Sequence, residues 1–390
     1  MGSQPIEEDI RHRTETLVAE HAGDDETTFL GAQFDAGLAW IHWPEGIGGL
    51  GLEPSLQRVV DEVLEEHGRR YPWLRNPMGI GMVGPSIAAH GTAEHQRHLR
   101  KIFTAEELWC QLFSEPGAGS DVATLSTRAE RDGDQWVANG QKVWTSRAAQ
   151  SAYGLLIART DPDVPKHQGL TAFILDMHAP GVDARGLRQI TGRSDEFCEV
   201  FIDNVRIHDS QRVGEVGDGW RVAVTTLMNE RVSIGGSVEP PGSGPIAVAV
   251  AAYKRNGSPA AHRDQLMKLW VEAEVLRLGN LRAAQVRAKG TPGPEGSVLK
   301  MGGALSSQRI GALAVDLCGA EGMLYDYEAA SGVGERMGDA VGQLLQVQAA
   351  TIAGGTSEVM RNILGERVLG LPGEPRTDRD VPWSQIPRGV

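Results

Sequence analysis

The 390-residue sequence predicts an α+β protein in which a central β domain separates two helical segments. Short apolar runs bounded by Asp, Pro and Gly occupy residues 111–214, which is typical of strands. Long amphipathic stretches return after Asp218. Before residue 110 apolar residues recur at helical spacing, as in the stripe formed by Leu56, Val59, Val60, Val63 and Leu64. We therefore expect three domains, comprising residues 1–110, 111–215 and 216–390.

The individual elements follow from local signals. In the first domain the Gly-rich segment 46–51 separates two helices. In the β domain Asn139-Gly140 predicts a hairpin turn between strands 135–138 and 141–144, because these residues tolerate the positive φ of a two-residue turn. Further strands are expected over 153–158, 170–175 and 199–207. In the last domain we expect helices over 220–234, with Asp218 as N-cap, 266–288 and 297–317.

Composition and charge narrow the class of protein. Hydrophobic residues make up 41% of the chain, which is enough for a globular core. The charge of −13, from 38 basic and 51 acidic residues, argues against a nucleic-acid-binding protein. Three widely spaced cysteines favour a reducing compartment. The polar N-terminus and the absence of an 18-residue apolar run predict a cytoplasmic protein without a membrane span.

Two motifs of the β domain are suited to holding a ligand. In the loop 112–121, two glycines and the Ser120 hydroxyl could cradle a phosphate, although a plain turn is an alternative. The loop is not a Gly-x-Gly-x-x-Gly motif, because Val122 stands where the third Gly would be. The second motif consists of Trp144, Thr145 and Ser146. Its aromatic face and hydroxyl groups could hold a planar heterocycle; the alternative is that Trp144 packs in the core.

Two motifs of the last domain are suited to acid–base chemistry. Glu230 shares a helix face with Ala223, Leu227 and Ile234, so we expect a desolvated carboxylate with a raised pKa that suits a general base. A buried Glu paired with an Arg is the alternative. In the second motif, Gly354-Gly355 ends a helix, Thr356 caps the next and Glu358 lies in its first turn. Its N–H groups could polarise a carbonyl, or the motif could be a simple helix corner.

Metal and hydrolase chemistry are not indicated. His95 and His98 share a helix face, but the chain has no His-Glu-x-x-His pattern, so we predict no metal site. A Gly-x-Ser-x-Gly nucleophile elbow is also absent from the sequence.

In order and spacing, these motifs resemble the acyl-CoA dehydrogenase family over residues 6–371. The resemblance implies an N-terminal helical domain, a central β-barrel or sandwich domain and a C-terminal four-helix bundle, with FAD between the last two. Ser120, Arg231 and Gly355 would contact the substrate. The implied cofactor-binding positions are Phe113, Ser114, Gly119, Ser120, Trp144, Thr145, Ser146, Asp316, Gly319, Thr356 and Glu358.

The resemblance also implies an activity, namely α,β-desaturation of an acyl-CoA thioester in fatty acid or lipid catabolism. A carboxylate removes the α proton, a backbone N–H polarises the carbonyl, and a hydride passes to flavin N5. Many members carry the catalytic Glu where this chain has Gly354. A subgroup similar to the isovaleryl- and long-chain-type enzymes keeps it in a Glu-Arg pair, which Glu230-Arg231 matches. Glu230 is therefore the expected base, and the Gly354 N–H the expected polarising group.

Two departures from the family pattern keep other functions open. The Arg-x-x-Phe-Gly stretch that helps to hold the adenosine arm is not found between Arg231 and Met267, and Asp316 replaces the usual Gln. Residues 316–322 would be contributed across subunits. We expect a homodimer or tetramer, or a heteromer, with electron-transfer flavoprotein as electron acceptor. The alternatives are a non-catalytic or half-site subunit of a heteromeric dehydrogenase, and a flavin oxidase or monooxygenase on the same fold.

Overall fold

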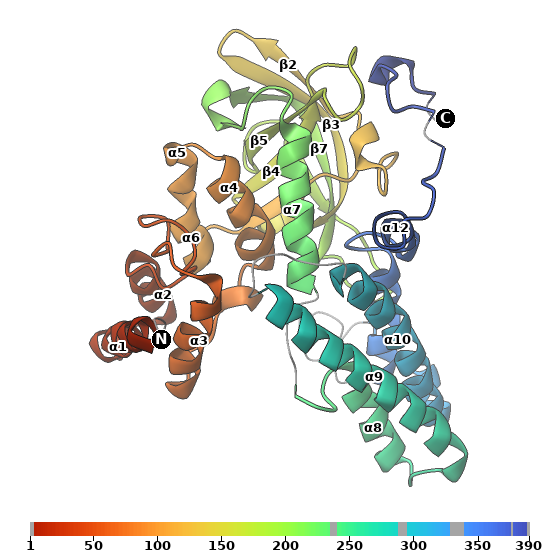
Figure 1. Cartoon of the computed structure of the whole chain (residues 1–390). Helices are drawn as coiled ribbons and strands as arrows, with labels where there is room; N and C mark the ends of the chain where they lie inside the picture. The colour runs from red at the N-terminus through yellow and green to blue at the C-terminus, as the bar shows by residue number, and fades with distance from the viewer. Residues whose placement is uncertain (1–3, 235–239, 288–294, 328–338, 376, 388–390) are drawn as a thin grey trace. The chain divides into compact units, whose positions relative to one another are not determined.

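A computed structural model describes residues 4–234, 240–287, 295–327, 339–375 and 377–387 (Figure 1). Contacts within the chain divide it into two compact units. The first unit comprises residues 1–186, 197–229 and 376–390, and the second comprises 187–196 and 230–375. The three-domain division drawn from the sequence remains a prediction.

The first unit begins with short helices that gather beside the sheet in Figure 1. The predicted apolar stripe lies on helix α3, where Val59, Val60 and Leu64 are buried. They belong to a core that also contains Ile10 and Leu17 of the first helix, so the 3.6-residue period places the stripe inward. The helices are α1 (Gln4–Glu20), α2 (Glu26–Asp35), α3 (Gln57–Glu66), α4 (Gly84–His90), α5 (Ala93–Gln96) and α6 (His98–Thr104).

An eight-stranded mixed sheet follows these helices in the first unit. The strands are β1 (Trp109–Leu112), β2 (Arg128–Asp132), β3 (Gln135–Ser146), β4 (Tyr153–Arg159), β5 (Leu170–Asp176), β6 (Val182–Gly186), β7 (Phe197–His208) and β8 (Arg212–Val213). Their order is β6-β7-β3-β2-β4-β5-β8, and β1 pairs with β4. Alternate residues of β4 enter different cores: Leu155 and Ile157 on one side, Leu156 and Ala158 on the other. Both faces of the sheet are therefore covered, which explains the continuous apolar runs.

The predicted hairpin at Asn139-Gly140 is wrong. Strand β3 runs without a turn from Gln135 to Ser146, and its register against β7 shifts between Ala138 and Gly140. A β-bulge accommodates the pair, since the Asn139 Oδ1 accepts the backbone N–H of Asn204 at 2.9 Å. A Cβ on residue 140 would lie 2.3 Å from Thr127 Oγ1, so close packing requires the glycine. The chain reverses earlier, at Gly133 (φ +66°), between β2 and β3.

Helix α7 (Gly219–Ile234) follows the sheet, and its residues from 230 onward belong to the second unit. Val222 and Ala223 are buried in the same core as Leu170 and Ala172 of β5, so the start of α7 packs on the sheet, as Figure 1 shows. Asp218 directly precedes the helix and its carboxylate accepts a hydrogen bond from Arg221 at 2.6 Å, whereas its role as N-cap stays a prediction.

The second unit is helical. Figure 1 shows α8, α9 and α10 running along one another. Ile246, Leu269 and Leu313 are among the residues of their common core. The expected helices over 266–288 and 297–317 are present as parts of longer helices, with residue 288 outside the described part of the chain. The helices are α8 (Pro245–Arg255), α9 (Ala260–Arg287), α10 (Glu295–Leu317), α11 (Ala340–Val347) and α12 (Ser357–Ile363).

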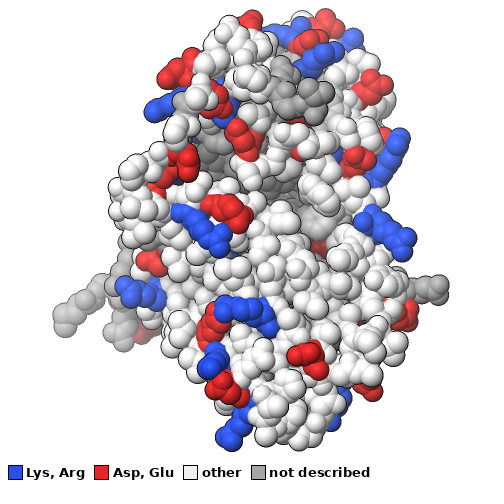
Figure 2. All heavy atoms as spheres, turned by 90° about the vertical axis from the view of Figure 1, so that its right-hand side faces the viewer, with Lys and Arg blue, Asp and Glu red and all other residues white. Residues whose placement is uncertain are grey.

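The surface carries mixed charge. On the face drawn in Figure 2, basic and acidic side chains lie in small groups, most of which contain both signs. Among the residues that the structure describes, none of the helices is long and apolar enough to traverse a bilayer.

Candidate functional site

The loop that follows β1 begins at a buried ion pair. Lys142 is fully buried on β3, and its Nζ lies 2.9 Å from Glu115 Oε1 and 3.1 Å from the Phe113 carbonyl oxygen. The Glu115 carboxylate also accepts the backbone N–H groups of Ser126 at 2.6 Å and Thr127 at 2.8 Å. Burial alone would raise the pKa of Glu115, but Lys142 and these donors outweigh it and hold the pKa below its usual value. The loop is thereby fixed at its start.

The structure brings the two β-domain motifs together. The Val143 N–H donates to the Ser114 carbonyl oxygen at 2.9 Å, so the loop and the end of β3 lie side by side. The next residue, Trp144, adopts a left-handed φ of +60° and its large apolar side chain is 63% exposed. Thr145 is buried, and its Oγ1 has no hydrogen-bond partner among the described residues. Gly119 and Ser120 are exposed further along the loop.

These features fit a planar heterocycle that carries phosphates. An uncovered indole offers an aromatic face, and the unpartnered Thr145 hydroxyl is a polar group whose partner is missing. Residue 119 has no atom within 4 Å of the position where a Cβ would lie, so a ligand has room to approach the backbone there. The first unit therefore provides a surface suited to FAD.

The C-terminal segment holds the far end of the same loop. The Lys166 ammonium lies 2.7 Å from Asp121 Oδ2 and 2.6 Å from Asp378 Oδ2. Burial opposes its charged form, but the two carboxylates outweigh burial and raise the pKa of Lys166. The indole N–H of Trp383 donates to the Thr124 carbonyl oxygen at 3.1 Å. Residues 377–387 thus hold the end of the loop together with the connection between β4 and β5, a role that the sequence motifs did not indicate.

The second unit contains the Gly-Gly motif. Gly354 and Gly355 have left-handed φ values of +67° and +90°. Thr356 caps α12, as predicted, since its hydroxyl oxygen accepts the Val359 N–H at 3.1 Å. Glu358 is exposed and lies 3.1 Å from Arg361. Its own backbone N–H, with smaller contributions from Thr356 and Arg361, lowers the pKa of Glu358. Glu358 is therefore an ionised carboxylate at neutral pH.

The remaining predicted site residues lie on three elements. Glu230 is half-buried on α7, three residues after the partly buried Leu227. The backbone of Arg231 continues the helix, whereas its side chain lies outside the described part of the chain. Asp316 is exposed near the end of α10, with its Oδ2 3.9 Å from His262 Nε2. Gly319 follows with a φ of +56°.

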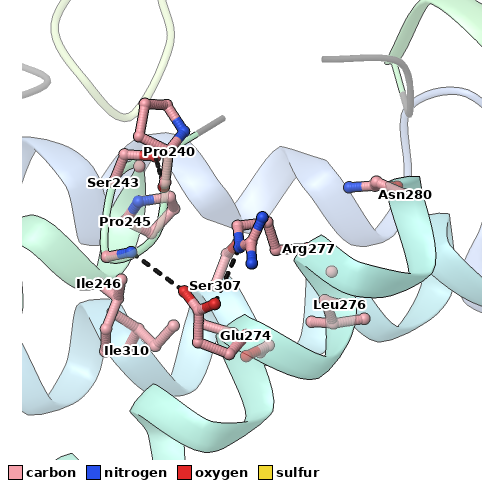
Figure 3. Close-up of a pocket in the computed structure, with 15 residues that line it drawn as sticks. Pro240, Ser243, Pro245, Ile246, Glu274, Leu276, Arg277, Asn280, Ser307 and Ile310 are labelled. Carbon is pink, nitrogen blue, oxygen red and sulfur yellow. Dashed lines mark hydrogen bonds and ion pairs between the residues drawn. The ribbon is translucent and has the colours of Figure 1, made fainter. Parts of the chain in front are cut away.

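A pocket of about 200 Å³ opens between the turn before α8 and helices α9 and α10 (Figure 3). Glu274 on α9 points toward this turn and toward Arg277. It accepts the Gly242 N–H at 3.0 Å and the Arg277 Nε–H at 2.8 Å, and the bond from Arg277 contributes most to a lowered pKa of Glu274. A Cβ on residue 242 would meet the Trp270 ring at 2.2 Å. The turn is therefore anchored to α9 through the carboxylate and through close packing.

Comparison with known proteins identifies the family. Residues 110–205 match the family model described as acyl-CoA dehydrogenase, middle domain, and residues 217–369 match the acyl-CoA dehydrogenase, C-terminal domain. Acyl-CoA dehydrogenase IpdE1 of Mycobacterium tuberculosis is 39% identical over 345 residues, which cover 87% of this chain and 86% of that protein. The chain belongs to the acyl-CoA dehydrogenase family.

Other relatives agree with this assignment. Acyl-CoA dehydrogenase FadE34 of M. tuberculosis is 39% identical over 366 residues, but this chain, matched over 93% of its own length, spans only about half (49%) of that protein. The solved structure of the Tcur3481-Tcur3483 steroid ACAD superposes with a TM-score of 0.72 at 25% identity, covering 95% of this chain and 98% of that one. The ChsE4-ChsE5 complex of M. tuberculosis gives a TM-score of 0.71 at 27% identity, covering 95% and 98%.

The family assignment confirms several expectations from the sequence. The acyl-CoA dehydrogenase fold is confirmed by the superpositions. The expectation of an FAD-dependent oxidoreductase of lipid catabolism is confirmed by the family models and relatives. The roles of individual residues remain predictions.

Proposed function

We propose that the chain desaturates an acyl-CoA thioester between Cα and Cβ, with Glu230 as the base that removes the α proton. The backbone at residue 354 carries this proposal. Its left-handed φ of +67° favours glycine, so the loop is poorly suited to present a side-chain carboxylate. Glu230, on a regular helix and half-buried, is a carboxylate that a helical scaffold can hold rigidly.

The division of labour among the residues follows from their chemistry. Glu230 would accept the α proton as the general base. The Gly354 N–H would polarise the thioester carbonyl, which stabilises the negative charge that develops on its oxygen. Ser120, Arg231 and Gly355 are the proposed substrate contacts. FAD, when bound, supplies the hydride acceptor.

The proposed cofactor contacts come from both units. In the first unit Trp144 and its neighbours would face the flavin ring, and the exposed Gly119 and Ser120 would face the pyrophosphate. In the second unit residues 316, 319, 356 and 358 are the proposed contacts. The complete proposed set is Phe113, Ser114, Gly119, Ser120, Trp144, Thr145, Ser146, Asp316, Gly319, Thr356 and Glu358.

We further propose an acyl group with a bulky ring system. The support is a structural relative at 25% identity, which is named as a steroid ACAD. The Glu-Arg pair of the branched- and long-chain-type enzymes points in the same direction. A cytoplasmic location and electron-transfer flavoprotein as electron acceptor complete the proposal.

Oligomerisation is supported by an apolar stripe on α9. Five large apolar side chains, spaced three or four residues apart, lie on one face of this helix and are 38–62% exposed. Exposed apolar surface of this extent usually marks an interface. We propose that a homodimer, tetramer or heteromer covers it. The stripe consists of Met267, Val271, Val275, Leu278 and Leu281.

A half-site subunit of a heteromer is the second candidate. The exposed Asp316 carboxylate, proposed to lie near a pyrophosphate, would repel it. Two structural relatives are each named for two components, Tcur3481-Tcur3483 and the ChsE4-ChsE5 complex. In this alternative the chain would bind FAD fully only with a related partner chain.

Cofactor extraction and anaerobic titration test these functions. The chain purified alone should yield FAD on chromatography, and a ring-bearing acyl-CoA should bleach its flavin band faster than a straight-chain acyl-CoA. Bound NAD without flavin would contradict the dehydrogenase function. A colourless chain that turns yellow only with a second subunit would support the half-site alternative.

A further inference from the structure

The Gly354-Gly355 pair needs an external restraint to act as a fixed hydrogen-bond donor. Two consecutive glycines with left-handed φ values join the 3₁₀ turn Gln348–Thr351 to α12. Glycine populates several backbone regions at similar energy, so such a pair does not hold one conformation by itself. A donor that polarises a carbonyl must nevertheless be oriented before the reaction.

A buried lysine on α10 provides such a restraint. Lys300 is only 7% exposed, and its Nζ donates a hydrogen bond to the Gly355 carbonyl oxygen. Ser297 and Ala304, three residues before and four residues after Lys300, are also buried, so the lysine lies on the inward face of the helix. A charged donor makes a stronger bond to a carbonyl than a neutral donor does.

The residues that flank the glycine pair are restrained as well. Thr356 caps α12 through its 3.1 Å bond with the Val359 N–H. A Cβ on residue 355 would lie 2.8 Å from Met360 Cε, so α12 packs closely against the loop. With the Gly355 carbonyl held by α10 and Thr356 held by α12, the peptide unit that joins residues 355 and 356 is fixed. Before the pair, the Ala353 N–H donates to the Ala349 carbonyl oxygen at 2.9 Å, so the segment that contains the Gly354 N–H is held at both ends.

We propose that Lys300 is a positioning residue that orients the Gly354 N–H for polarisation of the substrate carbonyl. The proposal rests on the proposed function, because it assigns a task to the donor used there. Lys300 acts through the loop and does not itself touch the thioester. Its loss should therefore weaken carbonyl polarisation in molecules that are folded and have acyl-CoA bound.

Difference infrared spectroscopy measures this polarisation without turnover. The holoenzyme is mixed anaerobically with a thioester whose carbonyl carries ¹³C and whose acyl chain cannot be desaturated, and the stretch of the bound carbonyl is compared with that of the free ligand. Wild type should shift the stretch to lower wavenumber. K300M should lose most of the shift, and with a reactive acyl-CoA its single-turnover flavin reduction should slow by roughly 10- to 100-fold, the scale of a misplaced reacting group. The dissociation constant of the acyl-CoA should change by a smaller factor than the rate of flavin reduction.

Three further variants make the test specific. K268M removes an exposed lysine of α9 and should match wild type in both measurements. K300R and K300Q keep a hydrogen-bond donor at position 300, so they keep the test interpretable if K300M fails to fold. The carbonyl shift and the rate of flavin reduction should decrease in the order wild type, K300R, K300Q, K300M. E230Q should keep the carbonyl shift while losing flavin reduction.

The outcomes separate this role from the proposed function. A wild-type shift that K300M and K300Q retain, with only their melting temperatures lowered, would assign Lys300 a purely structural role and overturn the inference. A wild-type holoenzyme that binds acyl-CoA without any shift would contradict the polarising role of Gly354, and the role of Lys300 with it. Loss of the shift in K300M, but not in K268M or E230Q, would support the inference.

Discussion

Replacement of Lys142 by methionine should destabilise the first unit more than any surface substitution. Methionine keeps most of the buried apolar stem but removes the charge that lies 2.9 Å from Glu115 and the donor to the Phe113 carbonyl. The Glu115 carboxylate would stay buried with only the N–H groups of Ser126 and Thr127 as partners. Removal of one member of a buried ion pair costs about 3–5 kcal/mol of unfolding free energy. An exposed pair contributes only about 0–1 kcal/mol.

Urea unfolding measures the loss. Tryptophan fluorescence and far-UV circular dichroism should be followed together, and the change in unfolding free energy taken where the two transitions coincide. In the double variant K142M/E115Q no charge is left buried, although the single amide oxygen can replace only one of the two carboxylate oxygens that accept the N–H groups of Ser126 and Thr127. The double variant should therefore be more stable than K142M, with a coupling energy of about 1–3 kcal/mol between the two sites.

The pH dependence provides an internal check. In wild type the pKa of Glu115 is lowered, so its contribution to stability is present above the unfolded-state pKa and is lost as pH falls through the folded-state pKa. Without Lys142 burial remains but the largest contribution that lowers the pKa of Glu115 is lost, so the folded-state pKa should rise and the penalty of K142M should shrink as pH falls from 7 to 4. A penalty below about 1 kcal/mol at pH 7, or one that does not change with pH, would refute the assignment of a buried ion pair.

Two further predictions concern the first unit. W383A should lower the unfolding free energy of this unit by about 3 kcal/mol, the low end of the range for loss of a buried aromatic side chain. It should also speed the release of flavin on dilution. The control Q385A, at an exposed position of the same segment, should change neither quantity. Burial lowers the pKa of His95 below its usual 6.5 despite its bond to the Ser210 carbonyl, so the unfolded chain binds the extra proton as pH falls. The unfolding free energy should therefore decrease as pH falls below about 6.5. In thermal unfolding, H95Q should make the stability depend less on pH in this range. An unchanged pH dependence in H95Q would contradict the role assigned to His95.

The sequence predicted those parts of the fold that depend on local periodicity. The period of apolar residues predicted both the stripe at Val59–Val63, which the structure places inward, and the long helices of the second unit, although α9 also carries an exposed apolar stripe. The prediction of a hairpin at Asn139-Gly140 was wrong because the residues that contact this pair are distant in sequence. Packing against Thr127 and a bond from the Asn204 N–H turn a local turn signal into a bulge.

The candidate site shows the same limit. The glycine-rich loop and the Trp144 motif were found as local patterns, and the structure brings Ser114 and Val143 within hydrogen-bond distance. Lys142 and Lys300 were missed because the partner of a buried lysine lies 27 or 55 residues away. The sequence pattern could have indicated them, because each lysine occupies a position of its strand or helix that faces inward.

The general base is tested most directly by anaerobic single-turnover reduction of the flavin in E230Q. Glutamine keeps the shape of Glu230 but cannot accept the α proton. We expect reduction by an acyl-CoA that bleaches the wild-type flavin to slow by about 10²–10⁴-fold at unchanged FAD content. E358Q, which alters an exposed carboxylate of the other candidate region, should reduce at a rate much closer to wild type. Near-normal reduction in E230Q, with a large loss in E358Q, would contradict the account and move the base to Glu358.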